Sequence, residues 1–229
     1  MSETIETITL DLPMGLSKVN CYLVGTGSKR VLIDTGPTRR RGSLEWALQD
    51  AECEPGDLSL IVLTHGDPDH TGNCAYLRKA FGAKAAMHVE EVGAVKDGNI
   101  AASRSNMTAN ARRLAKMVSP MVRLKRADRF KPDMTFTDGE NLASYGVNAL
   151  VIHTAGHSDG SVSILTDQGD LFCGDLMENI KGPAPGSIAD DRDLQAASIS
   201  RIIEMGAKMV YPGHGDPFTI EEYREACTP

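Results

Sequence analysis

The segment that most constrains the fold is a polar loop that directly follows an apolar run. Residues 58–63 form a short run with β-branched members between turn residues, which predicts a buried strand. The loop after it places two imidazoles and two carboxylates within six positions, in the order Leu63-Thr64-His65-Gly66-Asp67-Pro68-Asp69-His70-Thr71-Gly72. A loop held by a buried strand can aim such side chains at one point. Imidazole with carboxylate suits Zn, Fe or Mn better than Ca or Mg, so the loop predicts a transition-metal site. Taken alone, it could also be a solvated loop that contains two histidines by chance.

Three further loops repeat this design. In each, a polar residue directly follows a glycine, which lets the backbone turn sharply: His157 in Gly156-His157-Ser158, Asp175 in Gly174-Asp175-Leu176, and His214 in Gly213-His214-Gly215. Four of the six histidines therefore lie in loops at predicted strand ends. Together with Asp67, Asp69 and Asp175 they make seven potential ligands, more than one catalytic Zn needs. Two metal ions that share Asp175 as a bridge account for this number.

The order of predicted elements indicates an α/β (α+β) fold. Strands are expected at 5–12, 19–24, 30–34, 58–63, 83–89, 134–136, 147–153, 161–165, 170–173 and 208–211. Helices are expected at 44–51, 71–81, 99–118, from Asp190 or Asp191 to Met205, and from Thr219 onward. Residues 182–186 are expected to form a loop without regular structure. We expect a single domain over residues 1–229 with a helical insertion at about 99–130.

Composition limits the functional classes. The chain has 229 residues, of which 41% are hydrophobic and 24% charged, as in an ordinary globular domain. No stretch has the length of a membrane span, and the N-terminus lacks a signal-peptide pattern. Five cysteines without CxxC spacing favour a reducing compartment. A cytoplasmic protein is therefore expected. The net charge of −7 disfavours nucleic-acid binding. The segment from Arg104 to Lys131 is basic; it is either a solvated helix face or a feature that attracts an anionic small-molecule substrate. The oligomeric state stays open.

Six motifs, in order along nearly the whole chain, resemble those of the metallo-β-lactamase-fold hydrolase superfamily. They are residues 19–24, 31–36, the loop around His65, residues 153–158, 174–176 and 212–215. The resemblance implies a four-layer αββα sandwich with two metal ions at one edge of the sheets. It assigns His65, the residue at position 67 and His157 to metal 1, assigns Asp69, His70 and His214 to metal 2, and makes Asp175 the bridge.

One residue departs from the family pattern. The motif His-x-His-x-Asp-His has Asp67 in place of its second histidine. A carboxylate adds negative charge and a hard oxygen, which favours Fe or Mn over Zn. The flavodiiron proteins of the same superfamily carry a glutamate at the matching position, although this chain lacks their flavodoxin domain. Asp67 is expected to be a ligand; the alternative is that it does not reach the metal and leaves that site weak or empty.

The resemblance implies a dinuclear-metal hydrolase in which a metal-bridging hydroxide attacks a small ester, thioester or lactone. Asp69 would orient the hydroxide as the catalytic residue, and the glyoxalase II-like branch is the expected relative, although its C-terminal substrate domain is missing. Two alternatives are an iron-dependent redox enzyme with a flavodiiron-like or persulfide dioxygenase-like site, and a metal-binding protein without turnover. Lys181 would bind an anionic substrate group or be a solvent-facing loop lysine.

Three other polar residues are interpreted from their positions. Asp34 ends a predicted strand on the sheet edge where the His65 loop emerges, so it is either a partner of a metal ligand or a turn-forming carboxylate. His88 and His153 have no glycine-turn context and are expected either to be structural or to contact a metal ligand.

Overall fold

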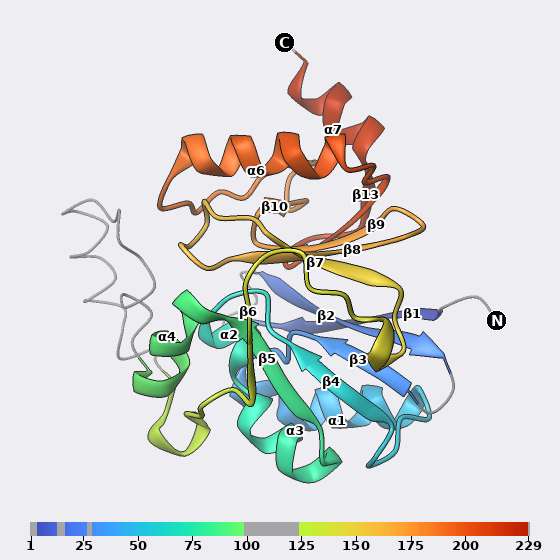
Figure 1. The fold of residues 1–229 in the computed structure, drawn as a ribbon, viewed down its shortest axis with the longest axis vertical. Coiled ribbons are helices and arrows are strands. Elements are labelled where there is room, and N and C mark those ends of the chain that lie inside the picture. The colour runs from blue at the N-terminus through green and yellow to red at the C-terminus, as the bar shows by residue number, and fades with distance from the viewer. Residues whose placement is uncertain (1–3, 13–16, 27–28, 99–123, 229) are drawn as a thin grey trace.

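Two β-sheets lie face to face and carry helices on their outer faces. The computed structural model describes residues 4–12, 17–26, 29–98 and 124–228. Helices α1 (Arg41–Asp50) and α3 (Cys74–Phe81) cover the outer face of the first sheet, and α6 (Arg192–Glu204) covers the second (Figure 1). The predicted four-layer αββα sandwich is thus confirmed.

The first sheet brings two polar strand ends to the same edge. Its order is β1-β2-β3-β4-β5-β6, with bounds Thr4–Asp11, Lys18–Thr26, Lys29–Ile33, Leu58–Val62, Lys84–His88 and Met134–Phe136. Strands β1, β2 and β3 pair antiparallel, whereas β3 to β6 run parallel. Because β3 and β4 are parallel neighbours, Asp34 and the His65 loop follow them at one sheet edge.

The second sheet delivers three more loops to its own edge. Its order is β13-β12-β9-β8-β7, with bounds Phe218–Thr219, Met209–Pro212, Asp170–Gly174, Val162–Thr166 and Ala149–His153. Strand β12 runs parallel to β9, and β8 is antiparallel to β9. The segment after β9, the segment after β12 and the β7–β8 connection therefore emerge together, and they carry Asp175, His214 and His157.

Three apolar layers separate the four structural layers. The middle layer, between the sheets, joins alternate residues of β2 to β4 with residues of β7 to β9, such as Val24, Ile33, Val151 and Phe172. The two outer layers pack the helices on the sheets; they include Leu44, Leu48, Leu77 and Ile61 on one side, and Ile199, Ile202, Leu171 and Val210 on the other. Burial of these side chains contributes about 25 cal/mol per Å² of apolar area, which fixes the sheets as a platform for the loops.

The helix predicted over residues 71–81 ends at Phe81 as expected but begins at Cys74, and a separate short helix precedes it. Helix α2 (Pro68–Thr71) begins with proline at its first position, and α3 starts at Cys74. Between them, the Asn73 amide donates to the backbone oxygen of Thr35, 2.8 Å away. A tertiary contact therefore ends the first helix within an otherwise continuous helical pattern.

The C-terminal helices begin at the predicted capping residues. The Asp191 carboxylate caps α6 by accepting from the backbone of Asp193 and Leu194, and Thr219 forms a capping box with Glu222 at the start of α7 (Ile220–Cys227). Helix α4 (Val92–Asp97) was not predicted.

Residues 182–186 are not free of regular structure, which corrects the prediction for this loop. Ala184–Pro185 forms β11, which pairs antiparallel with β10 (Met177–Glu178). The predicted helix at 99–118 and most of the predicted insertion lie outside the described residues. No helix within the described ranges is long and apolar enough to cross a membrane.

Candidate metal centre

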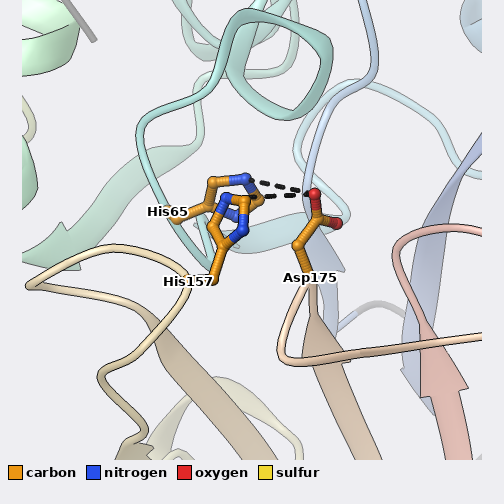
Figure 2. Close-up of side chains that lie close together, drawn as sticks. All are labelled: His65, His157 and Asp175. Atoms are coloured by element: carbon orange, nitrogen blue, oxygen red, sulfur yellow. Dashed lines mark ion pairs between the residues drawn. The ribbon is translucent and has the colours of Figure 1, made fainter. Parts of the chain in front are cut away.

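Seven polar side chains from both sheets converge at the shared edge. His65, Asp67, Asp69 and His70 come from the segment after β4, and His157, Asp175 and His214 come from loops of the second sheet. Six of them form two donor groups, within each of which the nitrogen or carboxylate atoms lie within 4.8 Å of one another: His65, His157 and Asp175; and Asp69, His70 and His214. Figure 2 shows His65 and His157 beside the Asp175 carboxylate.

Asp67 lies beside two histidines of the first donor group, although it is not one of that group's three members. Its Oδ2 atom lies 3.7 Å from Nε2 of His65 and 3.5 Å from Nε2 of His157. The Oδ2 atom of Asp175 lies 3.9 Å from each of these nitrogens. Two ligands of a tetrahedral Zn are separated by about 3.4 Å, given metal–ligand bonds of about 2.0–2.1 Å. The Asp67 carboxylate is thus close enough to both histidine nitrogens to share a metal ion with them.

Asp175 also faces the second donor group. Its Oδ1 atom is 3.2 Å from Nε2 of His70, and its Oδ2 atom is 3.5 Å from Nε2 of His214. The Oδ2 atom of Asp69 lies 3.6 Å from the His214 nitrogen and 4.0 Å from that of His70. One carboxylate therefore lies between the two groups, as a bridging ligand would.

Hydrogen bonds orient all four imidazoles with Nε2 toward the centre. The Nδ1 atoms of His157 and His214 lie 2.8 and 2.6 Å from the backbone oxygens of Ile188 and Lys18. Since a carbonyl only accepts, each Nδ1 carries the proton and each Nε2 keeps its lone pair for a metal. The remaining two imidazoles reach side chains through Nδ1, as described next.

Asp34 is the common partner of His65 and His70. Its Oδ2 atom is 2.8 Å from Nδ1 of His70, and it accepts a hydrogen bond of 2.8 Å from the Thr64 hydroxyl. The same hydroxyl oxygen lies 3.0 Å from Nδ1 of His65. The backbone N–H of Thr64 donates to Asp34 Oδ1 at 2.9 Å. Of the two interpretations of Asp34, the structure supports the one in which it orients metal-site histidines.

The Asp34 backbone is itself in an uncommon conformation. Its φ of +59° lies in the left-handed region, which Asp and Asn tolerate better than most residues. The backbone N–H of Asp34 donates to Val62 in the neighbouring strand at 2.8 Å. The residue is buried at 2% exposure, so the hydrogen bonds of its side chain to Thr64 and His70 offset the cost of a carboxylate removed from water.

Three buried polar atoms in this cluster satisfy no hydrogen-bond geometry within the described part of the chain: Nε2 of His65, and Nε2 of His70 and Oδ1 of Asp175, which face each other as an ion pair at 3.2 Å. A buried polar atom without a partner costs about 1–3 kcal/mol. All three belong to the proposed donor groups and face the same small region. The residues present therefore fit a pair of bound metal ions.

The cluster strongly perturbs its own protonation. Burial, followed by the neighbouring imidazoles of His70 and His157, lowers the pKa of His65 well below its usual range. Burial opposes charge on His214 as well, but the Asp175 carboxylate outweighs it and raises the pKa of His214 to about 9. Without a cation, the second group thus holds positive charge on imidazole beside carboxylate.

Close approach explains a glycine before Asp175. Gly174 has φ +50°, and a Cβ atom there would lie 2.6 Å from the Thr64 hydroxyl oxygen. Any larger residue would push apart β9 and the segment that carries His65. The predicted need for a sharp turn is confirmed at this position.

Other residues predicted from the sequence lie apart from the centre or beside it. Lys181 is exposed in the β10–β11 connection, and its role with substrate stays a prediction. His88 and His153 stack on each other, with ring centroids 4.3 Å apart, and are not in either donor group, which agrees with a structural role. Sequence reasoning missed Thr64 and the buried Glu91. It also missed the two backbone acceptors, for which residue type gives no signal.

The sequence of this chain matches one protein family and is similar to known proteins of that kind. A family model described as the metallo-beta-lactamase superfamily matches residues 14–214. The chain is 29% identical over 219 residues to thioesterase pkgB of Emericella nidulans, an alignment that covers 92% of this chain. It spans only 51% of that relative's length.

Two solved structures are similar over almost all of this chain. The metallo-beta-lactamase family protein TTHA1429 from Thermus thermophilus matches with a TM-score of 0.73 and 25% identity, covering 97% of this chain and 77% of that one. TTHA1623 in a di-iron-bound form matches with a TM-score of 0.69 and 25% identity, covering 96% and 98%.

Proposed function

This chain belongs to the metallo-beta-lactamase superfamily, and from that premise we propose that it is a dinuclear-metal hydrolase of a small thioester or ester. The observation that carries the proposal is the convergence of four imidazole nitrogens and three carboxylates, with three buried atoms that lack hydrogen-bond partners among the described residues. The name of the thioesterase relative supports the thioester within this class. The chain spans about half of that relative's length, so the proposal takes only the thioester class from it and not the relative's particular substrate.

In this proposal His65, Asp67 and His157 would hold one metal ion, Asp69, His70 and His214 would hold the other, and Asp175 would serve both, since its carboxylate lies between the two groups. Two such ions, when bound, lower the pKa of water and polarise the attacked carbonyl oxygen. The chain supplies the fixed geometry, since each imidazole is held through Nδ1. No Ser or Cys nucleophile is required.

Asp69 is the carboxylate best placed to act on the attacking water. Its side chain is 31% exposed, against 19% for Asp67 and 15% for Asp175. It is therefore the most accessible to water of the three carboxylates. Although part of its side chain is exposed, the protein groups around the carboxylate remove most of its hydration, and this desolvation raises the pKa of Asp69. A raised pKa suits a group that orients water and takes its proton.

The test is a panel of acyl-thioesters, carboxylic esters, lactones and phosphodiesters with metal-loaded protein. We expect turnover of a thioester or ester that is abolished by a chelator and falls at least about 100-fold in Asp69→Asn. Asp216→Asn is the matched control, because Asp216 is exposed in the neighbouring loop. Fully loaded protein that turns over none of the acyl substrates would refute the proposal.

A second function, iron-dependent redox chemistry, is favoured by one specific observation. Asp67 lies within 3.7 Å of both histidine nitrogens of the first group, and a carboxylate there favours Fe or Mn. TTHA1623, a structural neighbour, has been crystallised in a di-iron-bound form. Iron-loaded protein that consumes oxygen and cleaves no acyl substrate would establish this alternative in place of hydrolysis.

A further inference from the structure

A buried carboxylate outside the seven-residue cluster joins two of its loops. Glu91 ends a short 3-10 turn, Val89–Glu91, that follows β5, and its side chain is 1% exposed. Its Oε2 atom accepts a hydrogen bond of 2.8 Å from the backbone N–H of Gly66. Its Oε1 atom accepts from the Ser158 hydroxyl at 2.7 Å and from the backbone N–H of Gly160 at 3.1 Å. Both oxygens are therefore used, each toward a different loop.

The two loops belong to different sheets. Gly66 stands between His65 and Asp67 in the segment after β4, whereas Ser158 follows His157 in the β7–β8 connection. Glu91 is 25 residues from Gly66 and 67 residues from Ser158 along the chain. A single side chain thus fixes the position of the Asp67 segment relative to that of His157, the two parts of the first donor group.

Tight packing leaves these loops little freedom around the carboxylate. A Cβ atom at Gly66 would lie 2.7 Å from Glu91 Oε2, and one at Gly160 would lie 2.9 Å from Glu91 Cγ. The glycines therefore let the backbone reach the carboxylate directly. A carboxylate suits this position because both of its ends accept, whereas an amide would present a donor to at least one of the three N–H or O–H groups.

We propose that Glu91 is a positioning residue that sets the distance between the Asp67 and His157 segments and so determines the metal affinity of the first donor group. This rests on the metal centre proposed above and adds a residue to it. Glu91 does not belong to either donor group. Its effect is expected to fall on the first group, because its hydrogen bonds end at Gly66 and Ser158, each directly beside a histidine of that group. Asp69 and His70 of the second group lie three and four residues beyond Gly66, and none of the three bonds reaches the loop that carries His214.

The experiment measures Zn²⁺ affinity by chelator competition in two backgrounds. His214→Ala impairs the second donor group and reports mainly on the first, and His157→Ala does the reverse. In each background Glu91→Ala and Glu91→Gln are compared with the parent, and Glu90→Ala serves as the matched control, because Glu90 is the exposed neighbouring acid. Circular dichroism checks that each variant is folded.

We expect Glu91→Ala to raise the Zn²⁺ dissociation constant about 10–100-fold in the His214→Ala background, the range found when groups that orient metal ligands are removed. Glu91→Gln, which keeps one acceptor and the side-chain volume, should have a smaller effect in the same direction. Neither change should alter affinity in the His157→Ala background, and Glu90→Ala should alter none.

Equal losses in both backgrounds would overturn the proposal, because they would indicate a general structural role for Glu91. Unchanged affinity in both would overturn it as well. If the His214→Ala parent with Glu91 intact binds no Zn²⁺, the metal centre itself is refuted, and this inference with it. None of these outcomes depends on hydrolysis, so the proposed activity can fail while this proposal stands.

Discussion

Replacing Asp34 by asparagine removes a buried negative charge and leaves the size of the side chain almost unchanged. Asparagine tolerates the φ of +59° as well as aspartate does, so the backbone adds no new strain. Its one oxygen can keep the bond to the Thr64 backbone N–H. Its NH₂ group would then face the Thr64 hydroxyl and Nδ1 of His70, both of which donate to Asp34 in the native protein.

The magnitude follows from the two bonds lost. Each charge-assisted hydrogen bond contributes about 1.5–3 kcal/mol, so the free energy of unfolding of the metal-free protein should fall by about 3–6 kcal/mol. An NH₂ donor opposite Nδ1 would also move the His70 proton to Nε2, which removes the lone pair needed for a metal. The metal affinity of the second donor group should therefore fall about 10–100-fold.

Urea denaturation in the presence of a chelator measures the first effect, and competition with a metal indicator measures the second. Asp50→Asn is the control, because it makes the same chemical change at an exposed residue at the end of α1. Native stability together with native metal affinity in Asp34→Asn would refute the role given to this carboxylate.

Three further predictions concern pH, a close approach and substrate binding. In the metal-free protein the pKa of His214 is about 9, above the ordinary 6.5. The stability that its charged form contributes should therefore be complete below about pH 6.5 and should be lost as the pH rises through 9. Metal affinity should rise over the same pH window, and calorimetry should detect the protons released on metal binding. Gly174→Ala should cost more than the roughly 1–2 kcal/mol of a left-handed alanine, because its Cβ meets Thr64; Gly139→Ala, with open space at φ +85°, should cost only the backbone part in urea titrations. Lys181→Ala should raise KM for anionic substrates with little change in kcat, and an equal KM would contradict its role in binding.

Sequence spacing identified the polar residues of the centre because they lie in the segments that follow strands, several directly after a glycine; Asp69 and His70 lie in the short helix α2 of such a segment. The structure brings all seven together, and Asp67 lies with His65 and His157 rather than apart from them. Strand positions followed from apolar runs, since a strand buried on both faces needs them. The order of strands and helices thus indicated an α/β fold, whereas the four layers were predicted from the resemblance of six motifs to a known superfamily.

The misses share a physical cause, which is that tertiary contacts decided them. The helical pattern runs through Gly72, but the structure ends α2 at Thr71 because Asn73 bonds to the Thr35 backbone. Backbone oxygens that orient His157 and His214 carry no residue-type signal. Glu91 stands in no motif, and its partners lie 25 and more residues away in the sequence.

The measurement that tests the central claim most directly is the metal content of protein purified from unsupplemented cells, beside Asp67→His. The account predicts about two metal ions per chain, as two donor groups require, with Fe or Mn in the native protein and a shift toward Zn in the variant. Two Zn ions in both proteins would remove the influence assigned to Asp67 and leave the hydrolase proposal in place. Less than one metal ion per native chain, restored by the variant, would contradict the dinuclear centre.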